Sequence, residues 1–302
     1  MKKKTGWRTA YDQIHYYLMV LPGLIWIILF SIVPMVGIVM AFEDFSPSRG
    51  WFGSEWVGME NFKYLSRLKE VRRVFANTLI IAGGKLVCNL LIPIVFAILL
   101  NEVRNMKFKK SVQTIVYLPH FISWVILANI LSTMLGYRGV FNVIFGWFGV
   151  KPQVFLGNPD IFRGILIGTD VWKEFGYGAV IYLAALSGID PNLYEAAAID
   201  GAGRWKLIRH ITLPSLAPTI VLMGTLSLGG ILNGGFDQVF NLYNASVYST
   251  ADIIDTWVYR MGLVKVQYSL ASCVGLLKSV ASFVLISASY MLAKRFANYS
   301  IF

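Results

Sequence analysis

The sequence has few charged residues and few of the residues that bind metals or form disulfides. Charged residues make up 14% of its 302 positions, against roughly 25% in an average soluble protein. Its only cysteines are Cys88 and Cys273, and its only histidines are His15, His120 and His210. They are widely separated, so they provide neither a disulfide framework nor the spacing of a metal site. We therefore expect no metal ion and no ordinary water-soluble globule.

Long apolar runs are abundant, because hydrophobic residues make up 56% of the chain. A helix that crosses the roughly 30 Å hydrocarbon core of a bilayer needs about 20 mostly apolar residues. Six segments meet that requirement, and the fourth is the most polar: 18–42, 74–100, 111–135, 161–186, 213–236 and 268–292. We predict an all-α polytopic membrane protein in which residues 1–302 form a single transmembrane domain.

The basic residues indicate the orientation of the chain in the membrane. There are 27 Lys and Arg against 16 Asp and Glu, a net charge of +11. Basic residues accumulate in cytoplasmic loops, and the short segments 2–4 and 104–110 fall inside if both termini are cytoplasmic. We expect segment 18–42 to be a retained helix and not a cleaved signal peptide. Topology and attraction to anionic lipid account for most of the charge, so we expect a membrane and no nucleic acid as partner.

The inner loop 187–212 departs from this pattern, because its acidic residues balance its basic ones. Asp190 followed by Pro191 is typical of a helix start, and the sequence predicts a helix over Asn192–Ile199 that Gly201 ends. A second short helix, Arg204–Ile211, is expected to end ahead of Pro214. A helix lying on lipid is the alternative, but such helices favour basic residues, and none occurs between Ser187 and Gly203.

The spacing within this loop identifies a family. Glu195, Ala196 and Ala197 are followed after three residues by Gly201, and after nine more by Ile211-Thr212-Leu213-Pro214. This resembles the Glu-Ala-Ala loop of permease subunits in binding-protein-dependent ABC importers. The flanking residues 194–202 and the segment Gly235-Phe236-Asp237-Gln238-Val239-Phe240 are similar to the carbohydrate branch, which includes maltose-type and oligosaccharide permeases.

The resemblance implies an ATP-driven importer that moves a sugar across the cytoplasmic membrane by alternating access. The short helix would sit in a groove of a separate ATPase. The partners would be a second permease subunit, two ATPase subunits or domains, and an extracytoplasmic sugar-binding protein. ATP and Mg would be bound by the ATPase and not by this chain, which lacks a Gly-x-x-x-x-Gly-Lys-[Ser/Thr] loop and is not expected to be an enzyme. The implied coupling residues are Glu195, Ala196, Ala197, Gly201, Ile211, Leu213 and Pro214.

Ionisable residues inside a membrane are costly and indicate a pathway or a partner. In the fourth segment Asp170, Lys173, Glu174 and Tyr177 share one helix face, with Trp172 nearby. Carboxylates, donors and aromatic surfaces suit a hydroxyl-rich substrate, so this face is a candidate sugar pathway. The alternative is a structural pair in which Asp170 and Lys173 neutralise each other.

Two further groups are candidates for the pathway. Asn233, Asp237 and Gln238 follow a run of glycines that permits either close packing or local unwinding, and we favour a gate or substrate role. Lys278 lies beside a stripe of small residues typical of helix packing. If Lys85, Lys173 and Lys278 face one cavity, they favour an acidic sugar over a neutral one as the substrate. His120, after Pro119, is interpreted as a locally satisfied polar residue.

One rival function belongs to a different class. Buried charges are also typical of an ion-coupled secondary transporter or a channel that works without nucleotide. The absence of a convincing internal repeat weakens that interpretation. A membrane scaffold without transport activity is a third alternative, and the buried charges argue against it.

Overall fold

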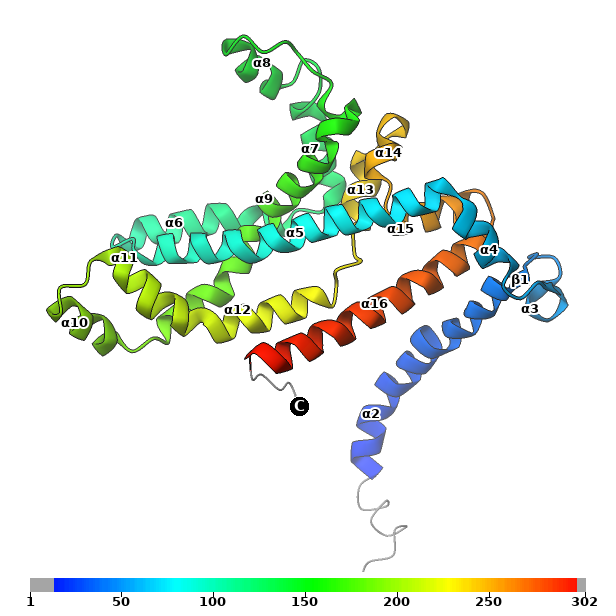
Figure 1. The fold of residues 1–302 in the computed structure, drawn as a ribbon, viewed down its shortest axis with the longest axis horizontal. Coiled ribbons are helices and arrows are strands. Elements are labelled where there is room, and N and C mark those ends of the chain that lie inside the picture. The colour runs from blue at the N-terminus through cyan, green and yellow to red at the C-terminus, as the bar shows by residue number, and fades with distance from the viewer. Residues whose placement is uncertain (1–13, 298–302) are drawn as a thin grey trace, which may run out of the picture. The chain divides into compact units, whose positions relative to one another are not determined.

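The computed structural model describes residues 14–297, which fall into two compact units (Figure 1). The first contains the chain up to Arg67 together with residues 260–276, and the second contains residues 68–259 and those from Leu277 onward. The lysines at positions 2–4, which support a cytoplasmic N-terminus, lie outside the described residues.

The first unit is built on the first apolar segment. Its elements in chain order are the helix α2 (Ile14–Ile27), a π-helical turn η1 (Ile28–Ile32), a 3-10 helix η2 (Val33–Phe42), the antiparallel strands β1 (Glu43–Asp44) and β2 (Glu55–Trp56) with α3 (Gly50–Gly53) between them, α4 (Glu60–Arg67), the π-helical η7 (Arg260–Val264) and the start of α16 (Tyr268–Ala297). The Asn61 amide donates hydrogen bonds to the carbonyls of Ala41 (3.1 Å) and Glu43 (3.0 Å). These bonds join α4 to the end of the first span.

The second unit contains the helices that position the candidate site. Its elements in chain order are α5 (Lys69–Asn101), α6 (Met106–Tyr117), η3 (Leu118–Phe121), α7 (Trp124–Met134), α8 (Val140–Trp147), η4 (Phe155–Gly157), α9 (Pro159–Ser187), α10 (Pro191–Ile199), α11 (Arg204–Leu207), η5 (Ile208–Thr212), α12 (Leu213–Leu228), α13 (Phe236–Leu242), η6 (Ala245–Val247), α14 (Tyr248–Ala251), α15 (Ile254–Tyr259) and the rest of α16. The long helices α5 and α9 pack along each other, and α6 and α12 both contact α9.

Side-chain caps explain where several of these helices begin. Asn105, Ser123 and Asn158 precede α6, α7 and α9, and each accepts a hydrogen bond from a backbone N–H of the first turn. Such caps satisfy donors that have no partner inside the helix. Ser123 therefore starts a new helix within a segment that the sequence presents as one apolar run.

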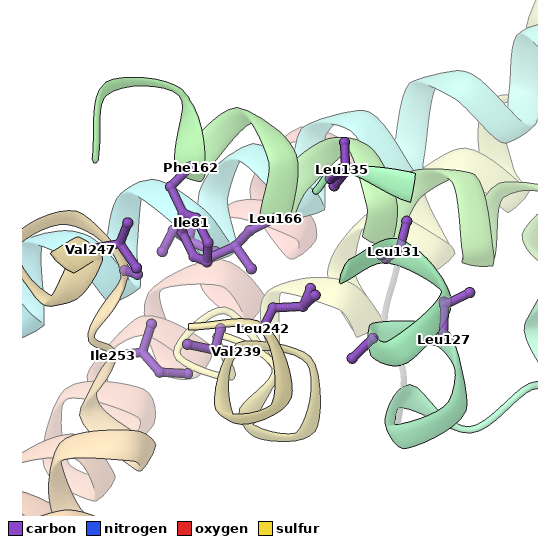
Figure 2. Close-up of a cluster of buried hydrophobic side chains, with 12 residues drawn as sticks. Ile81, Leu127, Leu131, Leu135, Phe162, Leu166, Val239, Leu242, Val247 and Ile253 are labelled. Carbon is purple, nitrogen blue, oxygen red and sulfur yellow. The ribbon is translucent and has the colours of Figure 1, made fainter. Parts of the chain in front are cut away.

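A buried apolar cluster holds the short helix α13 in place (Figure 2). It joins Ile81 of α5 and Leu166 of α9 to Val239 and Leu242 of α13, with Leu127 of α7 beside them. Burial of aliphatic side chains stabilises such a contact by roughly 1.5–3 kcal/mol for each one. The cluster fixes one end of a segment that is otherwise connected to α12 by irregular chain.

The predicted spans agree with the structure in part. Within the described residues, four helical segments have the length and apolarity to cross a bilayer: Ile14–Phe42, Lys69–Asn101, Arg204–Leu228 and Tyr268–Met291. The sequence correctly predicts an all-α fold with apolar helices. Helix α9 includes the predicted span 161–186 and, with 29 residues, is long enough to cross a bilayer. Its ionisable side chains make it more polar than the four helical segments named above. Six membrane crossings therefore stay a prediction.

Two predicted spans are wrong in detail. Segment 111–135 is not one straight helix, because its two halves, Met106–Phe121 and Trp124–Met134, are bent by 104°. Segment 213–236 is helical only to Leu228, after which tight turns and irregular chain lead to Gly235. Gly235 adopts a φ of +86°, a conformation that favours glycine and ends regular helix.

A third correction concerns the inner loop. The helix predicted over Arg204–Ile211 does not stop ahead of Pro214 but continues as one helical run to Leu228. Pro214 lies inside this run, at the second position of α12, and the π-helical turn η5 directly precedes it. The helix thus passes the proline with a local change of its hydrogen-bond pattern.

Candidate functional site

A cavity of about 320 Å³ lies where the fifth apolar segment is broken. Its walls come from α7, α13, α15 and the irregular residues 229–235 between α12 and α13, which we call the break. The lining residues are Trp124, Asn233, Gly235, Phe236, Asp237, Gln238 and Asp255. Trp124 provides an aromatic surface, and the other side chains except that of Phe236 provide amide and carboxylate groups. Three of the predicted pathway residues, Asn233, Asp237 and Gln238, are thus brought together.

Lys278 contacts two of the polar residues that line the cavity. Its ammonium donates to Asp255 Oδ1 at 2.5 Å and to Asn233 Oδ1 at 3.2 Å. The two side chains of the ion pair are 19% and 27% exposed, so the pair is partly accessible. Among the described residues Asp237 has no ion-pair partner, and it is exposed. The cavity is therefore lined by two carboxylates, Asp237 and Asp255, and Asp255 belongs to a partly accessible ion pair with Lys278.

Gln238 forms the back of the cavity and is fully buried. Its amide nitrogen donates to the Leu166 carbonyl at 2.7 Å and to Thr169 Oγ1 at 2.8 Å, while its oxygen accepts from Lys85. All of its strong donors and its carbonyl oxygen are engaged. In this conformation Gln238 holds α13 against α9 and is not free to bind a ligand.

A second polar group lies at the bend between η3 and α7. Lys173 of α9 donates to the His120 carbonyl at 2.7 Å and to Glu174 Oε1 at 2.9 Å, and Glu174 Oε2 meets His120 Nδ1 at 2.7 Å. The His120 ring stacks on Tyr177, with centroids 4.0 Å apart and planes 2° apart. Of the predicted face of α9, Lys173, Glu174 and Tyr177 therefore pack against the bend.

The two groups meet at Trp124. The Lys173 ammonium lies 5.7 Å from the centroid of the Trp124 ring, whose residue also lines the cavity. Trp172 belongs to neither group: it is 47% exposed on another side of α9. Its role in a substrate pathway stays a prediction.

The pairing of charges differs from the sequence-based alternative. Asp170 does not neutralise Lys173 but contacts Lys85 of α5, with Oδ1 at 3.1 Å from the ammonium. Asn89 donates to the other carboxylate oxygen at 2.9 Å. Because Lys173 pairs with Glu174 and Lys278 with Asp255, each of the three lysines has a carboxylate partner. The acidic-sugar hypothesis requires the three lysines to face one cavity, but none of them is among the residues that line the cavity of about 320 Å³.

The inner loop forms the short helix that the sequence predicts. Helix α10 begins after Asp190, whose carboxylate accepts from the Asn192 N–H at 2.9 Å. It ends at Gly201 (φ +75°), where the Gly201 and Ala202 N–H groups bond back to the carbonyls of Ala198 (3.1 Å) and Ala197 (2.9 Å). This pair of bonds is the Schellman ending, which favours glycine at that position.

Apolar and acidic side chains of this loop are exposed. Glu195 and Ala196 are exposed on α10, and Ile199 is 87% exposed. Tyr194 anchors the other side through a 3.1 Å hydrogen bond between its hydroxyl and Thr212 Oγ1. A second cavity of about 200 Å³ separates the two arms of the loop, lined by Ala197, Asp200, Ala202, Lys206, Leu207, His210 and Ile211. In Figure 1, α10 lies at one end of the second unit.

Comparison with known proteins identifies the family. Residues 90–298 match the family described as binding-protein-dependent transport system inner membrane component. This chain belongs to that family. The match includes the whole Glu-Ala-Ala loop and the cavity, so the permease resemblance inferred from residues 195–214 is confirmed.

Relatives of this permease cover nearly its full length. It is 42% identical over 96% of its chain to the polygalacturonan/rhamnogalacturonan transport system permease protein YteP of Bacillus subtilis (strain 168), and covers 91% of that protein. It is 39% identical to protein LplB of the same organism, over 99% of its own chain and 95% of LplB.

Two solved structures resemble the permease in fold and sequence. One is a crystal structure of a bacterial ABC transporter involved in import of the acidic polysaccharide alginate, with a TM-score of 0.89, 38% identity and coverage of 96% of this chain and 98% of that one. The other is a bacterial alginate ABC transporter in complex with an alginate pentasaccharide-bound periplasmic protein, with a TM-score of 0.90, 37% identity and coverage of 98% and 99%. The permease is therefore a transmembrane subunit of a binding-protein-dependent importer.

Sequence reasoning missed three residues of the site. Asp255 lies outside every predicted span, Trp124 is one of nine tryptophans, and His120 was interpreted only as locally satisfied. Trp124 had one local signal, since it follows Ser123, a residue typical of helix starts. Asp255 had none, because its partner Lys278 is 23 residues away.

The described residues contain no group of three or more His, Cys, Asp or Glu side chains placed to hold a metal ion. The side chains that line the cavity of the permease are amides, carboxylates and two aromatic rings, and the Lys278 ammonium contacts one of the amides. Such groups can bind hydroxyls and flat sugar faces, and they provide no recognisable nucleophile and base pair.

Proposed function

We propose that this permease is one half of the transmembrane pathway of an ATP-driven importer for an acidic oligosaccharide. The observation that carries the proposal is the resemblance, over nearly the whole chain, to a polygalacturonan/rhamnogalacturonan permease and to an alginate importer subunit. Polygalacturonan and alginate both carry a carboxylate on their uronate units. The shared chemistry is therefore a negatively charged sugar chain.

The complete importer has further parts. A second permease subunit completes the pathway, an extracytoplasmic binding protein delivers the sugar, and two ATPase subunits or domains bind ATP and Mg. The ATPase activity belongs to those partners and not to this chain, and both termini of the permease are cytoplasmic. The alginate transporter in complex with its oligosaccharide-bound periplasmic protein supports the assignment of a binding protein.

The cavity suits a sugar passing through. Trp124 offers a flat apolar surface for a pyranose face. The Asn233 amide can donate hydrogen bonds to hydroxyl groups, and the Asp237 carboxylate can accept hydrogen bonds from them. Lys278 can exchange its contact with Asp255 for a uronate carboxylate, since the ion pair is partly accessible. Lys173, Glu174 and Tyr177 continue the polar surface beyond Trp124.

The loop of α10 suits a docking role towards the ATPase. Its helix is held at both ends, by Asp190 and by Gly201, so it protrudes as a stiff unit. Glu195, Ala196 and Ala197 allow close approach of a basic groove, while Ile211, Leu213 and Pro214 connect the loop to α12. Motion of the ATPase is thereby transmitted to the helix that leads to the cavity.

The proposed substrate class is tested with the complete complex in proteoliposomes. ATP hydrolysis is measured with the binding protein present and with either oligogalacturonates and oligoalginates or neutral malto- and galacto-oligosaccharides. We expect acidic chains to stimulate hydrolysis and to be taken up, and neutral chains to do neither. Equal stimulation and uptake with neutral chains would overturn the assignment of an acidic substrate.

A further inference from the structure

The irregular segment between α12 and α13 is held at one point by a buried lysine. Lys85 of α5 is 6% exposed. Its ammonium donates to the Gly234 carbonyl at 2.8 Å, to Gln238 Oε1, and to Asp170 Oδ1 at 3.1 Å. An ammonium has three donors, and each of them has a different acceptor. Lys85 therefore links α5, α9 and the start of α13.

This contact fits the backbone of the break. Gly235 has a φ of +86°, and a Cβ there would lie 2.6 Å from the Lys85 ammonium. A Cβ on Gly234 would lie 2.9 Å from Ile253 Cδ1. A side chain at position 235 would therefore be strained by the positive φ and would meet the Lys85 ammonium, and a side chain at position 234 would crowd Ile253. The carbonyl of Gly234, which no helix satisfies, obtains its partner from the lysine.

The cavity residues stand directly on either side of this contact. Asn233 precedes Gly234, and Asp237 follows Gly235 by two residues. Both line the cavity, whereas Lys85 does not. The lysine thus acts on the cavity through the backbone that carries those side chains.

A charge inside a membrane protein is costly, by about 2.5–3.5 kcal/mol on insertion scales, and is retained where it has a task. The Lys85–Asp170 pair is one of several polar contacts between α5 and α9, because Arg163 of α9 also donates to Asn77 Oδ1 of α5 at 2.7 Å. Lys85 differs from Arg163 in that it also donates to the Gly234 carbonyl in the irregular segment.

We propose that Lys85 is a positioning residue of the transport pathway: with Asp170 as its counter-charge, it fixes the unwound segment so that Asn233 and Asp237 face the cavity. The proposal rests on the proposed sugar pathway. It assigns to the buried pair a role in substrate affinity without contact with substrate.

The test compares three variants in the complete complex: Lys85→Met, the double variant Lys85→Met/Asp170→Asn, and the control Arg163→Met. The double variant removes the pair without leaving a buried unpaired charge. We expect it to keep basal ATP hydrolysis while its KM for oligosaccharide uptake rises on the order of tenfold or more, since small misplacements of binding groups cost that much. Arg163→Met is expected to keep its KM, because it breaks a contact between α5 and α9 away from the break. A double variant with the wild-type KM would show that Lys85 only balances Asp170.

A second measurement needs no substrate. In membranes that contain the complex without native cysteines, the rate of thiol labelling is measured at Asn233→Cys and at Ala179→Cys, a fully buried site on α9. With the Lys85–Asp170 pair removed, labelling at position 233 should rise several-fold while position 179 stays protected. Unchanged labelling at 233, or a rise at both sites, would overturn the positioning role. Failure of wild-type import of acidic oligosaccharides would instead refute the proposed function and leave this comparison valid.

Discussion

Lys85, Lys173 and Lys278 each meet a carboxylate, and the accessibility of each pair decides what it can do. The Lys85–Asp170 side chains are 8% and 15% exposed, whereas those of Lys278 and Asp255 are 19% and 27% exposed. A well-buried pair is costly to separate, because each partner would be left without compensation. A partly accessible pair can exchange partners with a ligand. By burial, the Lys85–Asp170 pair is therefore suited to a structural role, and the Lys278–Asp255 pair is the better candidate for contact with substrate.

The accessible pair predicts opposite effects for its two members. Asp255→Asn frees Lys278 for a uronate carboxylate, so it should lower the KM for acidic oligosaccharides. Lys278→Met leaves Asp255 and Asp237 as repelling charges, so it should raise that KM. Uptake assays with acidic and neutral chains of equal length measure both. If the two substitutions shift KM in the same direction, the pair has no role in selecting charge.

Trp124 is expected to contribute an aromatic surface to substrate binding. Trp124→Ala should raise the KM for uptake on the order of tenfold, corresponding to about 1.4 kcal/mol, and Trp124→Phe should raise it less. Trp147→Ala is the control, because Trp147 is 78% exposed on α8 and does not line the cavity. Equal KM values for Trp124→Ala and Trp147→Ala would remove the tryptophan from the pathway.

Residues whose partners are near in sequence could be predicted, and those with distant partners could not. Asp190 and Gly201 act on backbone groups within five residues, so their roles as helix start and end were visible in the sequence. Lys85 meets Asp170 and Gln238 across 85 and 153 residues, and no local pattern assigns those pairs. The Asp170–Lys173 alternative was wrong for this reason.

At the scale of elements, interruptions of helices place the functional groups. The 104° bend carries His120 and Trp124 to α9, and the break after α12 carries Asn233 and Asp237 to the cavity. Apolar composition alone predicts neither interruption, because both segments read as continuous spans. Pro119, Ser123 and the glycines are the local signals, and only tertiary contacts decide whether they bend a helix.

The end of α10 predicts how substitutions in the inner loop 187–212 change stimulated ATP hydrolysis. Gly201→Val places a β-branched residue at a φ of +75°, which costs roughly 1–2 kcal/mol and loosens the helix end. ATP hydrolysis stimulated by the binding protein should fall several-fold. Gly203→Ala is the matched control, because Gly203 has a φ of −72° and open space around it. Stimulated hydrolysis that is equal in the two variants would contradict a role for this helix end.

The contact between α6 and α9 predicts a difference in stability. A Cβ on Gly176 would lie 2.4 Å from the Val116 carbonyl oxygen, so Gly176→Ala must separate the two helices. Overpacking of this kind typically costs about 1–3 kcal/mol. The Tm of the purified complex in detergent should fall for Gly176→Ala and stay unchanged for Gly168→Ala. Gly168 lies on the same helix, and a Cβ there would meet no atom within 4 Å. A Tm that falls equally in both variants would show that the contact is not specific.

At the scale of the whole molecule, the permease combines the α10 loop, the proposed docking site of the ATPase, with a cavity at a break in a helix. The two are joined by one continuous helical run, Arg204–Leu228, which begins at the loop and ends where the break begins. Under the proposed function, this helical run is the connection through which an ATPase docked at the loop acts on the cavity.

The energy source of uptake tests this account most directly. Labelled acidic oligosaccharide is offered with binding protein to vesicles that contain the complete complex, with ATP, a non-hydrolysable analogue or an ion gradient as the only difference. We predict uptake with ATP alone, and a several-fold fall in that uptake in the Gly201→Val variant. Uptake that persists without ATP, follows the ion gradient and is unaffected by Gly201→Val would contradict the account.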